Sequence, residues 1–480
     1  MREVMAGLPL LLPGAAAAAT LLVRRSRAVF GIAWGTVVGL WLMGLLLVVS
    51  PPAGWDALAR WYNLMVLALA GLSLAVSVHV IGAERAQGEI GDAEVRRYFA
   101  LFEVFTLCLL AIGCFTNYLA IWAAVEGTTL SSVLLVAFAG GPRPAEAAWK
   151  YLVVTGIGGL LALMATVLIL YGAGVPLGGW SLAPVGAGAI SAGGRIAVEV
   201  GLVLAVVGYG SKAGLVPFHT WLPDAHSEAP APVSAALSAI KLVGGIYALL
   251  RLVALAGSVV GATWPHVLLI VTGLLSLGIA AAAIPGQRDL KRMFAYSSIE
   301  HMGIIALGAG FGGIGLLGAL LHMWTHGFSK SALFYGSGNV RLRYAATGGP
   351  GVRGILGAMP LTGSALALAT VAIVGLPPFG LFWSEWLVLL GGVQAGQLIW
   401  VGVALVFLII NLLGFGLRLP DLLLGGSPRG TGGGHAESLS ALWPLGVALV
   451  GALVVGLVLP GAFHGTWVGA AHVLTGGGQG

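Results

Sequence analysis

The residues best placed to do chemistry in this chain are charged side chains inside apolar stretches. Lys212 follows a run of valine, leucine and glycine of nearly membrane-spanning length, and Pro217 comes five residues later. A lysine in hydrocarbon is costly and needs a partner or a pathway. A helix broken at membrane depth is tolerated only where protein or a water-filled cavity surrounds it. Together these features predict a protonatable site on an ion path.

Further ionisable residues lie in the other apolar stretches or continue the Lys212 motif. Such residues inside a membrane are functional by default, so we predict one shared proton pathway. Its expected members are Glu126, Lys212, Lys241, His322, His326, Lys330 and Glu385. A supporting role is expected for His219, Asp224, His226, Glu300 and His301.

His322, His326 and Lys330 are spaced by four residues, so they fan over only about 80° of one helix surface. Since histidine passes protons in both directions near neutral pH, this stripe is typical of a proton wire. Two alternatives stay open. Histidines four apart can bind zinc, although no cysteine or carboxylate accompanies them on this helix. They can also simply pack against neighbouring backbone.

Glu126 is a natural partner for a buried lysine. As a structural carboxylate it would hold two helices together through an ion pair with Lys212. The same contact can act as a switch, because a nearby carboxylate keeps the ammonium charged and its withdrawal favours release of the proton. The sequence alone does not show that the two side chains touch.

Composition places these residues in a membrane protein. Of 480 residues, 58% are hydrophobic and only 8% are charged, which no soluble domain of this size matches. The two cysteines, Cys108 and Cys114, lack the spacing of a metal or Fe–S site and are expected to be small core residues. With no nucleotide-binding fingerprint either, we expect no cofactor, no bound metal and no catalytic residue.

We count about 14 apolar segments of helical length and therefore expect an all-α polytopic membrane protein. One set of alternate loops carries 16 of the 23 Lys and Arg residues, and the other set carries four. The positive-inside rule then places both termini outside the cytoplasm. The apolar stretch near residues 6–24 resembles a signal peptide, but further spans follow at once, so it is expected to be a retained first helix.

Glu385 follows a prolyl break at Pro377–Pro378, much as Lys212 precedes the break at Pro217. Paired interrupted spans in the two halves of a carrier indicate repeats with a site at mid-membrane. We therefore predict two inverted five-helix repeats with discontinuous helices 7 and 12. The expected divisions are 1–97 (helices 1–3), 98–255 (helices 4–8), 256–420 (helices 9–13) and 421–480 (helix 14 and tail).

At this point the residues resemble a known family. The stretch KAGLVPFHTWLPDAHSEAPAPVSA is similar to the signature of the antiporter-like subunits of respiratory complex I, Mrp antiporters and membrane-bound hydrogenases. RDLKRMFAYSSIEHMGI (288–304) and HMWTHGFSKSALFYGSGN (322–339) extend the match over nearly the whole chain. The wording SSIEHMG, with GLPPFGLFWSEW, most resembles hydrogenase-4 component F of formate hydrogenlyase-type complexes. The resemblance implies a polar axis along which protons move, formed by Glu126, Lys212, the His322–His326–Lys330 group and Glu385.

The chain departs from the family at the eighth helix. Many relatives carry a lysine about four residues before the tyrosine that ends this helix, where this chain has Val243. Lys241 stands six residues before Tyr247, about 200° away around a helix. Three explanations stay open: a long stem that still reaches the axis, a local bulge that rotates the side chain inward, or snorkelling toward an interface. The chain also stops soon after the last span, unlike the longest complex I relatives.

The leading hypothesis is a proton-translocating subunit of a multi-subunit redox complex in the plasma membrane of a prokaryote. Its partners would be further antiporter-like subunits, a quinone- or hydrogenase-anchoring subunit, a peripheral redox arm and the lipid bilayer, with no nucleic acid. A Mrp-type cation/proton antiporter subunit without redox partners is the alternative. A scaffold that anchors an enzyme and moves nothing is a third, which the row of intramembrane charges disfavours.

Overall fold

The computed structural model describes residues 7–52, 54–179, 182, 190–349, 351–425, 437–462 and 464–475. Helices dominate because backbone groups in hydrocarbon must be satisfied within the segment. The described part contains no strand, only an isolated bridge between Asp289 and Gly348. The first six helices are α2 (Leu8–Leu22), α3 (Ser26–Val49), α4 (Ala57–Ala86), α5 (Asp92–Cys114), α6 (Tyr118–Val136) and α7 (Pro142–Gly172). Next come α8 (Ala192–Ala213), α9 (Trp221–Glu228), α10 (Ala231–Ala236), α11 (Leu242–Val260), α12 (Thr263–Ala283) and α13 (Leu290–Phe311). The last are α14 (Gly313–Tyr344), α15 (Ile355–Ala358), α16 (Pro360–Ile373), α17 (Gly380–Gln394), α18 (Leu398–Leu424), α19 (Leu439–Ala462) and α20 (His464–Thr475).

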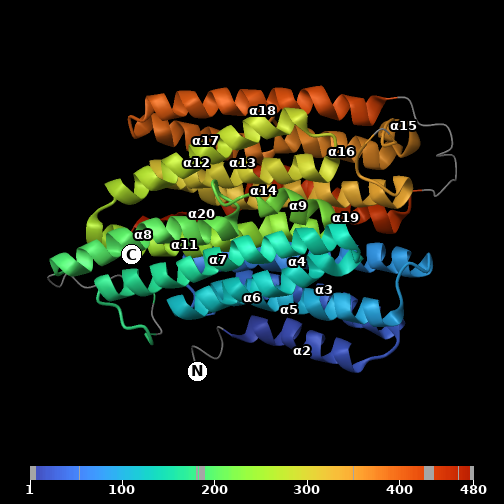
Figure 1. Cartoon of the computed structure of the whole chain (residues 1–480), viewed down its shortest axis with the longest axis horizontal. Coiled ribbons are helices and arrows are strands. Elements are labelled where there is room, and N and C mark those ends of the chain that lie inside the picture. The colour runs from blue at the N-terminus through green and yellow to red at the C-terminus, as the bar shows by residue number, and fades with distance from the viewer. Residues whose placement is uncertain are drawn as a thin grey trace.

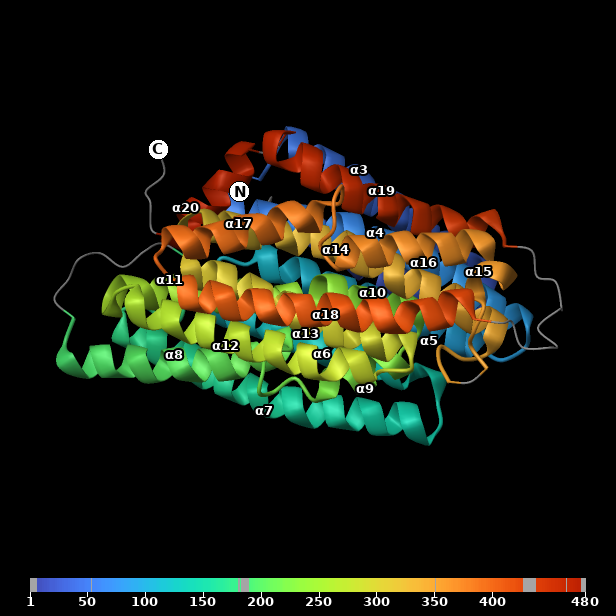
Figure 2. The same ribbon diagram turned by 90° about the horizontal axis from the view of Figure 1, so that it is seen from above.

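The long helices lie side by side along one axis of the molecule, and the loops gather at its two ends (Figures 1 and 2). Ten helices in the described part are long and apolar enough to cross a membrane. The helices α3 and α18 lie at the edge of the bundle and expose most of their apolar surface, whereas α4, α10 and α13 are largely buried. The protein is therefore a polytopic helical membrane protein, as the composition predicts.

Small residues set the closest helix contacts. A Cβ atom at Gly208 of α8 would lie 2.4 Å from the backbone nitrogen of Ala162 in α7, and the Gly158 carbonyl lies within 2.8 Å of the same point. The hydrophobic effect does not drive helices together within a lipid bilayer, so membrane helices associate through such close backbone packing. The approach of α7 to α8 matters because it borders the site around Lys212.

Two helices are interrupted where the sequence carries prolines. The helix α8 ends at Ala213, Gly214 is left-handed (φ 73°), and α9 begins only at Trp221. The helix α16 ends at Ile373, Gly375 is left-handed (φ 69°), and α17 begins at Gly380. Each connecting segment contains one cis prolyl peptide, Val216–Pro217 and Pro377–Pro378 respectively.

A third irregularity is a π-helical turn at Leu237–Lys241, between α10 and α11. The structure also contains α20, a twelve-residue helix after α19 that hydropathy did not predict. It packs on α4 and α14, and Trp467 donates a 3.0 Å hydrogen bond to the Leu317 carbonyl. The expected divisions after residues 97, 255 and 420 fall inside α5, α11 and α18, close to their ends.

Candidate functional site

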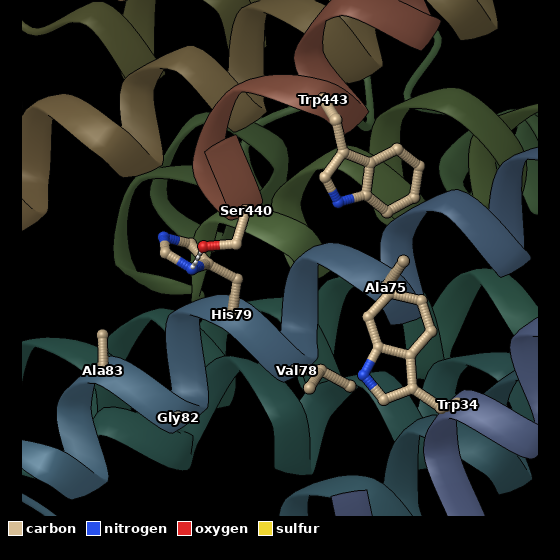
Figure 3. A pocket seen from close by; sticks show the side chains of 8 residues that line it. All are labelled: Trp34, Ala75, Val78, His79, Gly82, Ala83, Ser440 and Trp443. Atoms are coloured by element: carbon tan, nitrogen blue, oxygen red, sulfur yellow. Dashed lines mark hydrogen bonds between the residues drawn. The ribbon is translucent and has the colours of Figure 1, made fainter. Parts of the chain in front are cut away.

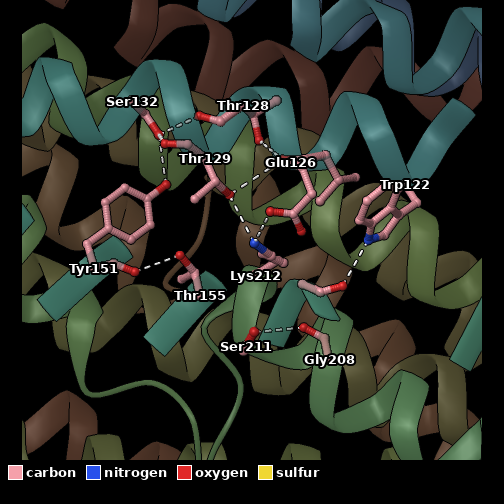
Figure 4. A network of polar contacts seen from close by, with 12 residues as sticks. Trp122, Glu126, Thr128, Thr129, Ser132, Tyr151, Thr155, Gly208, Ser211 and Lys212 are labelled. Atoms are coloured by element: carbon pink, nitrogen blue, oxygen red, sulfur yellow. Dashed lines mark hydrogen bonds and ion pairs between the residues drawn. The ribbon is translucent and has the colours of Figure 1, made fainter. Parts of the chain in front are cut away.

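The first half of the site is an ion pair between α6 and α8 (Figure 4). Lys212 is fully buried, and its Nζ donates to Glu126 Oε2 at 2.8 Å and to Thr129 Oγ1 at 3.2 Å. Glu126 and Thr129 are three residues apart on α6, so they share the face that meets α8. The Glu126 side chain stays 21% exposed. One partner is therefore sealed inside the protein while the other retains contact with the surface.

The Glu126 carboxylate packs against the α7 backbone at Gly159, where there is no side chain. A Cβ atom at Gly159 of α7 would lie 2.1 Å from Glu126 Oε1, and one at Gly158 would lie 1.8 Å from the Ser211 hydroxyl. The Gly159 carbonyl also accepts a 2.9 Å hydrogen bond from Trp122 Nε1. We call Gly158 and Gly159 the α7 glycine recess. The sequence analysis missed it, although adjacent glycines in a membrane helix signal a close contact.

Lys241 reaches the first half through the π-turn. Its Nζ donates to the Lys212 carbonyl at 3.1 Å and lies 4.3 Å from the Trp221 ring centre and 5.0 Å from that of Tyr151. These two rings stack with centres 4.3 Å apart. The extra residue of a π-turn rotates everything beyond it by roughly 100° relative to an α-helix. Of the three explanations left open, the structure shows the local bulge.

Serine hydroxyls and the Phe294 carbonyl lie between the π-turn and Lys330. Ser238, in the π-turn, lies 2.8 Å from Ser298 of α13. The neighbouring Ser297 accepts a 2.8 Å hydrogen bond from Lys330 Nζ, which also donates to the Phe294 carbonyl at 2.6 Å. The Lys330 ammonium is thus held by neutral oxygens and has no ion pair within the described residues. This differs from Lys212, whose charge is matched by a carboxylate.

Beyond Lys330, a chain of imidazole hydrogen bonds leads to α17. His301 Nδ1 lies 3.0 Å from His322 Nε2, and His322 Nδ1 lies 2.9 Å from Ser384 Oγ. Because the Leu381 carbonyl can only accept, Ser384 donates its hydroxyl proton to that carbonyl and accepts a hydrogen bond from His322 Nδ1–H. His322 Nε2 is then the acceptor for His301 Nδ1–H. Transfer along the chain reverses both tautomers, as in a proton relay.

His326 lies on the same stripe of α14 as His322 but does not join the hydrogen-bonded chain. Neither of its ring nitrogens finds a hydrogen-bond partner within the described residues. Its ring centre lies 5.2 Å from that of His301 and 6.3 Å from that of His322. The residue that bonds to His322 is therefore His301 of α13, which the sequence analysis placed among the supporting residues.

Glu385 follows Ser384 directly and lies half-buried at the far end of this chain. A Cβ atom at Gly375 would lie 2.2 Å from Glu385 Oε2, so this carboxylate also rests against a glycine. His301, His322 and Glu385 each offer one ligand atom, and these atoms lie within 4.8 Å of one another. Three such donors suit a zinc ion. However, the two imidazoles bond directly to each other here, so an ion would have to break that hydrogen bond.

The remaining expected residues line the approach to the axis. Asp224 forms ion pairs with Lys150 (3.1 Å) and Arg292 (2.9 Å) at one end of the bundle. His226 is buried, and its Nδ1 lies 2.8 Å from the Leu222 carbonyl. His219 lies half-buried in the segment between α8 and α9, and Glu300 is buried on α13 beside His301. None of these four side chains makes a hydrogen bond to a pathway residue within the described part.

Lys291 is a buried cation near the start of α13 that the sequence did not single out. It is 1% exposed and donates to the Ser227 carbonyl at 2.9 Å and to the Ala229 carbonyl. These carbonyls end α9, where a positive charge is favourable. The residue opens α13 within the RDLKRMF motif, and a lysine between an N-cap aspartate and an apolar run could have signalled this position.

A polytopic helical protein with two interrupted helices and a buried lysine paired to a glutamate is an antiporter-like membrane subunit. Comparison with known proteins agrees with this class. Residues 116–411 match the family described as "NADH:quinone oxidoreductase/Mrp antiporter, TM". The chain therefore belongs to this family, whose matched region covers the helices from α6 to most of α18.

Individual relatives support the assignment. A hydrogenase-4 component F homolog of Methylacidiphilum infernorum is 35% identical over 80% of this chain and 82% of its own. The NADH-quinone oxidoreductase subunit N of Desulforudis audaxviator is 32% identical over 94% of this chain and 89% of its own. Among solved structures, a chain of an archaeal membrane-bound sulfane sulfur reductase covers 98% of both chains with a TM-score of 0.86 at 24% identity. That structural likeness establishes the fold.

Proposed function

We propose that this chain moves protons through the axis from Glu126 to Glu385 as a subunit of a multi-subunit respiratory redox complex. The observation that carries the proposal is the fully buried Lys212 ammonium, bonded at 2.8 Å to a carboxylate that keeps access to the surface. A buried charge is tolerable while it is paired and becomes costly once its partner leaves. Movement of Glu126 would therefore release the Lys212 proton into the axis.

The axis offers successive sites for that proton. The Lys212 carbonyl and the stacked rings of Trp221 and Tyr151 stabilise the charged form of Lys241. The Ser238–Ser298 contact leads toward Lys330, and His301 and His322 then lead to Ser384 and Glu385. Water between these groups would complete the connections that no direct hydrogen bond makes. Energy would arrive by coupling at the two lateral ends, where both carboxylates lie.

The same proposal includes the membrane arrangement. Ten of fourteen crossings would form two inverted five-helix repeats, α5 to α11 and α12 to α18, each with one discontinuous helix near mid-membrane. The expected divisions 98–255 and 256–420 correspond to these repeats. With the arginine-rich loops inside, both termini would lie outside the cytoplasm of a prokaryotic cell. Partners would be further antiporter-like subunits, a quinone- or hydrogenase-anchoring subunit and a peripheral redox arm.

The proposal is tested by proton pumping of the intact complex in inside-out membrane vesicles. Lys212→Ala and Glu126→Ala should each abolish pumping, because one removes the carrier of the proton and the other its counter-charge, while electron transfer in the peripheral arm continues. Arg195→Ala is a matched control, since it breaks an exposed ion pair with Glu199 (3.1 Å) far from the axis. Undiminished pumping in both axis variants would contradict the proposal.

A Mrp-type cation/proton antiporter is the second candidate, because the matched family description names Mrp antiporters beside the oxidoreductase. It predicts sodium-dependent dissipation of a pH gradient in cells that lack any associated hydrogenase or dehydrogenase. A requirement for such partners, with no effect of sodium, would favour the redox complex.

A further inference from the structure

Two cavities open near the end of the bundle where the arginine-rich loops gather. The first has a volume of about 410 Å³ and lies between α3, α4 and α19, where Trp34, His79, Ser440 and Trp443 line it (Figure 3). Its described lining carries no permanent charge. The second has a volume of about 240 Å³ and is lined by residues of very different character, namely Gln287, Arg288, Gly349, Val352, Arg353, Arg418, Asp421 and Leu422.

The second cavity, which we call the arginine pocket, is lined by three arginines from distant parts of the chain. Arg288 precedes α13, Arg353 follows α14 and Arg418 lies near the end of α18. Within the described residues none of the three makes an ion pair, although Asp421 lines the same cavity. Three cations face one carboxylate there, so the pocket keeps a net positive charge that no described group neutralises.

The rim of the arginine pocket is held in place by hydrogen bonds. The Leu290 amide donates to the Thr347 carbonyl at 3.0 Å, and the Gly349 amide donates to the Arg288 carbonyl at 3.3 Å. Thr347 Oγ1 also donates to Asp289 at 2.6 Å. The segment before α13 and the segment after α14 therefore form one fixed edge instead of two separate loops.

The third arginine is positioned independently. Arg418 Nε donates to the Pro285 carbonyl, which leaves the outer nitrogens of its planar fork available. The Arg353 backbone is fixed through its carbonyl, which accepts a 3.2 Å hydrogen bond from the Tyr344 hydroxyl. A planar fork that is already oriented loses little freedom when it binds a phosphate through two parallel hydrogen bonds.

The surroundings of the arginine pocket point to a lipid. The helix α18 lies at the outer edge of the bundle (Figure 1) and exposes a column of leucines next to the pocket. Leu413, Leu417 and Leu424 are 58%, 67% and 70% exposed. Such a column would face hydrocarbon, while the pocket at its end would lie at headgroup depth. Basic pockets between membrane helices at this depth bind anionic headgroups.

We propose that the arginine pocket binds the phosphate-ester headgroup of an anionic phospholipid, with the acyl chains along the exposed face of α18. The positive-inside bias explains why arginines occur at this end, but it requires only their number. It does not require three of them to converge on a cavity with a fixed rim. The site is independent of the proton axis, so it would stand even if the proposed function failed.

The test is lipid retention by the full chain, purified with its native partner subunits and placed in phosphatidylcholine nanodiscs that contain a minor fraction of phosphatidylglycerol. Phosphatidylglycerol that remains after washing is counted by mass spectrometry. Arg353→Gln/Arg418→Gln should lower retention by about tenfold or more, because each arginine near the surface contributes to anionic lipid binding. Arg353→Lys/Arg418→Lys, which keeps the charge but loses the fork, should give an intermediate loss.

The matched control is Arg97→Gln/Arg143→Gln. It removes two exposed arginines from the same end of the bundle, on α5 and α7, and should leave retention unchanged. Equal retention in all variants would overturn the proposal, as would an acidic segment of a partner subunit found in the pocket. A parallel arm adds labelled inorganic phosphate. Arginine-dependent binding of labelled phosphate, with lipid retention that does not depend on the arginines, would assign the pocket to free phosphate and overturn the lipid source, whereas arginine-dependent lipid retention supports it.

Discussion

The two interrupted helices of this protein share a backbone conformation at their breaks, but the charged residues around them are paired differently. At both breaks a glycine is left-handed, and in each half of the site a carboxylate lies against a glycine: Glu126 against Gly159 in the middle of α7, and Glu385 against Gly375 at the break itself. Around the first break, Glu126 bonds directly to the Lys212 ammonium at 2.8 Å. Around the second, Lys330 has no ion pair within the described residues, and hydrogen bonds run from His301 through His322 to Ser384, the sequence neighbour of Glu385. The comparison suggests a charge switch in one half and a neutral relay in the other.

The difference has a physical basis. In a direct ion pair each charge favours the charged form of the other, so moving one partner away changes the protonation of the other. In a hydrogen-bonded chain of neutral imidazoles the electrostatic energy changes little when a proton passes, because each transfer only exchanges one tautomer for another. Energy input would therefore act on the Glu126–Lys212 pair, and the histidines would pass on the released proton.

The largest effect within the relay half is expected from His322→Gln. This change removes the side chain that joins His301 to Ser384, so pumping should fall by about tenfold or more, within the usual range for a lost proton-transfer group. His326→Gln should cost much less, since His326 makes no hydrogen bond within the described residues. Equal losses in vesicle pumping assays would contradict the assignment of His301 and His322 as the direct link.

Lys241 tests whether the π-turn matters. Lys241→Val should reduce pumping severalfold, because it removes the ammonium between the two halves. Moving the lysine to the position common in relatives, with Lys241→Val/Val243→Lys, should not restore pumping, since position 243 lies about 200° around the helix from Lys241, which contacts the Lys212 carbonyl and the Trp221 ring. Recovery in the double variant would mean that the axis tolerates either register, and the geometric argument would fail.

The α7 glycine recess gives a smaller and more local test. Gly159→Ala would place a Cβ atom 2.1 Å from Glu126 Oε1 and should lower pumping a fewfold by displacing the carboxylate. Gly156→Ala, on the same helix, meets no atom within 4 Å and serves as the control. If both substitutions reduce pumping equally, helix packing rather than Glu126 position is responsible.

The corresponding change in the second half is Gly375→Ala, which would approach Glu385 Oε2 to 2.2 Å at φ +69°. Because alanine is strained at this φ, the control must carry the same strain. Gly174→Ala provides it, with φ +69° and no atom within 4 Å. A neutral relay should be less sensitive than an ion pair, so the loss should be smaller for Gly375→Ala than for Gly159→Ala in the same pumping assay.

The smallest effect on pumping is expected at an ion pair outside the axis. Arg251 binds Asp56 through two bonds of 2.5 and 2.7 Å, and Asp56 also caps α4 by accepting from the Ala59 amide. Arg251→Met should lower stability by roughly 3 kcal/mol, the scale for breaking a buried pair. Pumping per assembled complex should stay unchanged. A thermal unfolding series measures the first quantity, and vesicle assays measure the second.

The contribution of the Arg251–Asp56 ion pair to stability changes with pH in a direction set by the pKa of Asp56. Burial by itself would raise the pKa of the Asp56 carboxyl, but the Arg251 charge and the hydrogen bonds outweigh burial and hold the pKa below its ordinary value of 3.8. A lowered pKa means stability that is complete at neutral pH and is lost only as the pH falls through that lowered value. Loss of this contribution between pH 5 and 8 would contradict the pairing.

Much of this arrangement could be inferred from residue types along the chain. The charges inside apolar stretches located Glu126, Lys212 and Glu385, and the prolines located both breaks. The motif around Lys212 indicated the family, which the comparisons confirmed. The count of fourteen crossings and the roles of the site residues stay predictions. Each successful inference depended on a property that one helix displays by itself, such as hydropathy, charge or a missing amide proton.

The partners within the site could not be inferred in this way. Spacing along α14 placed His326 near His322, but the direct hydrogen bond to His322 comes from His301, which packing against α13 brings into contact. The π-turn that ends at Lys241 sets how this side chain meets α8 and α9, and no period in the sequence announces such a turn. Which side chains meet depends on how helices cross and where they bulge, and only the folded chain decides this.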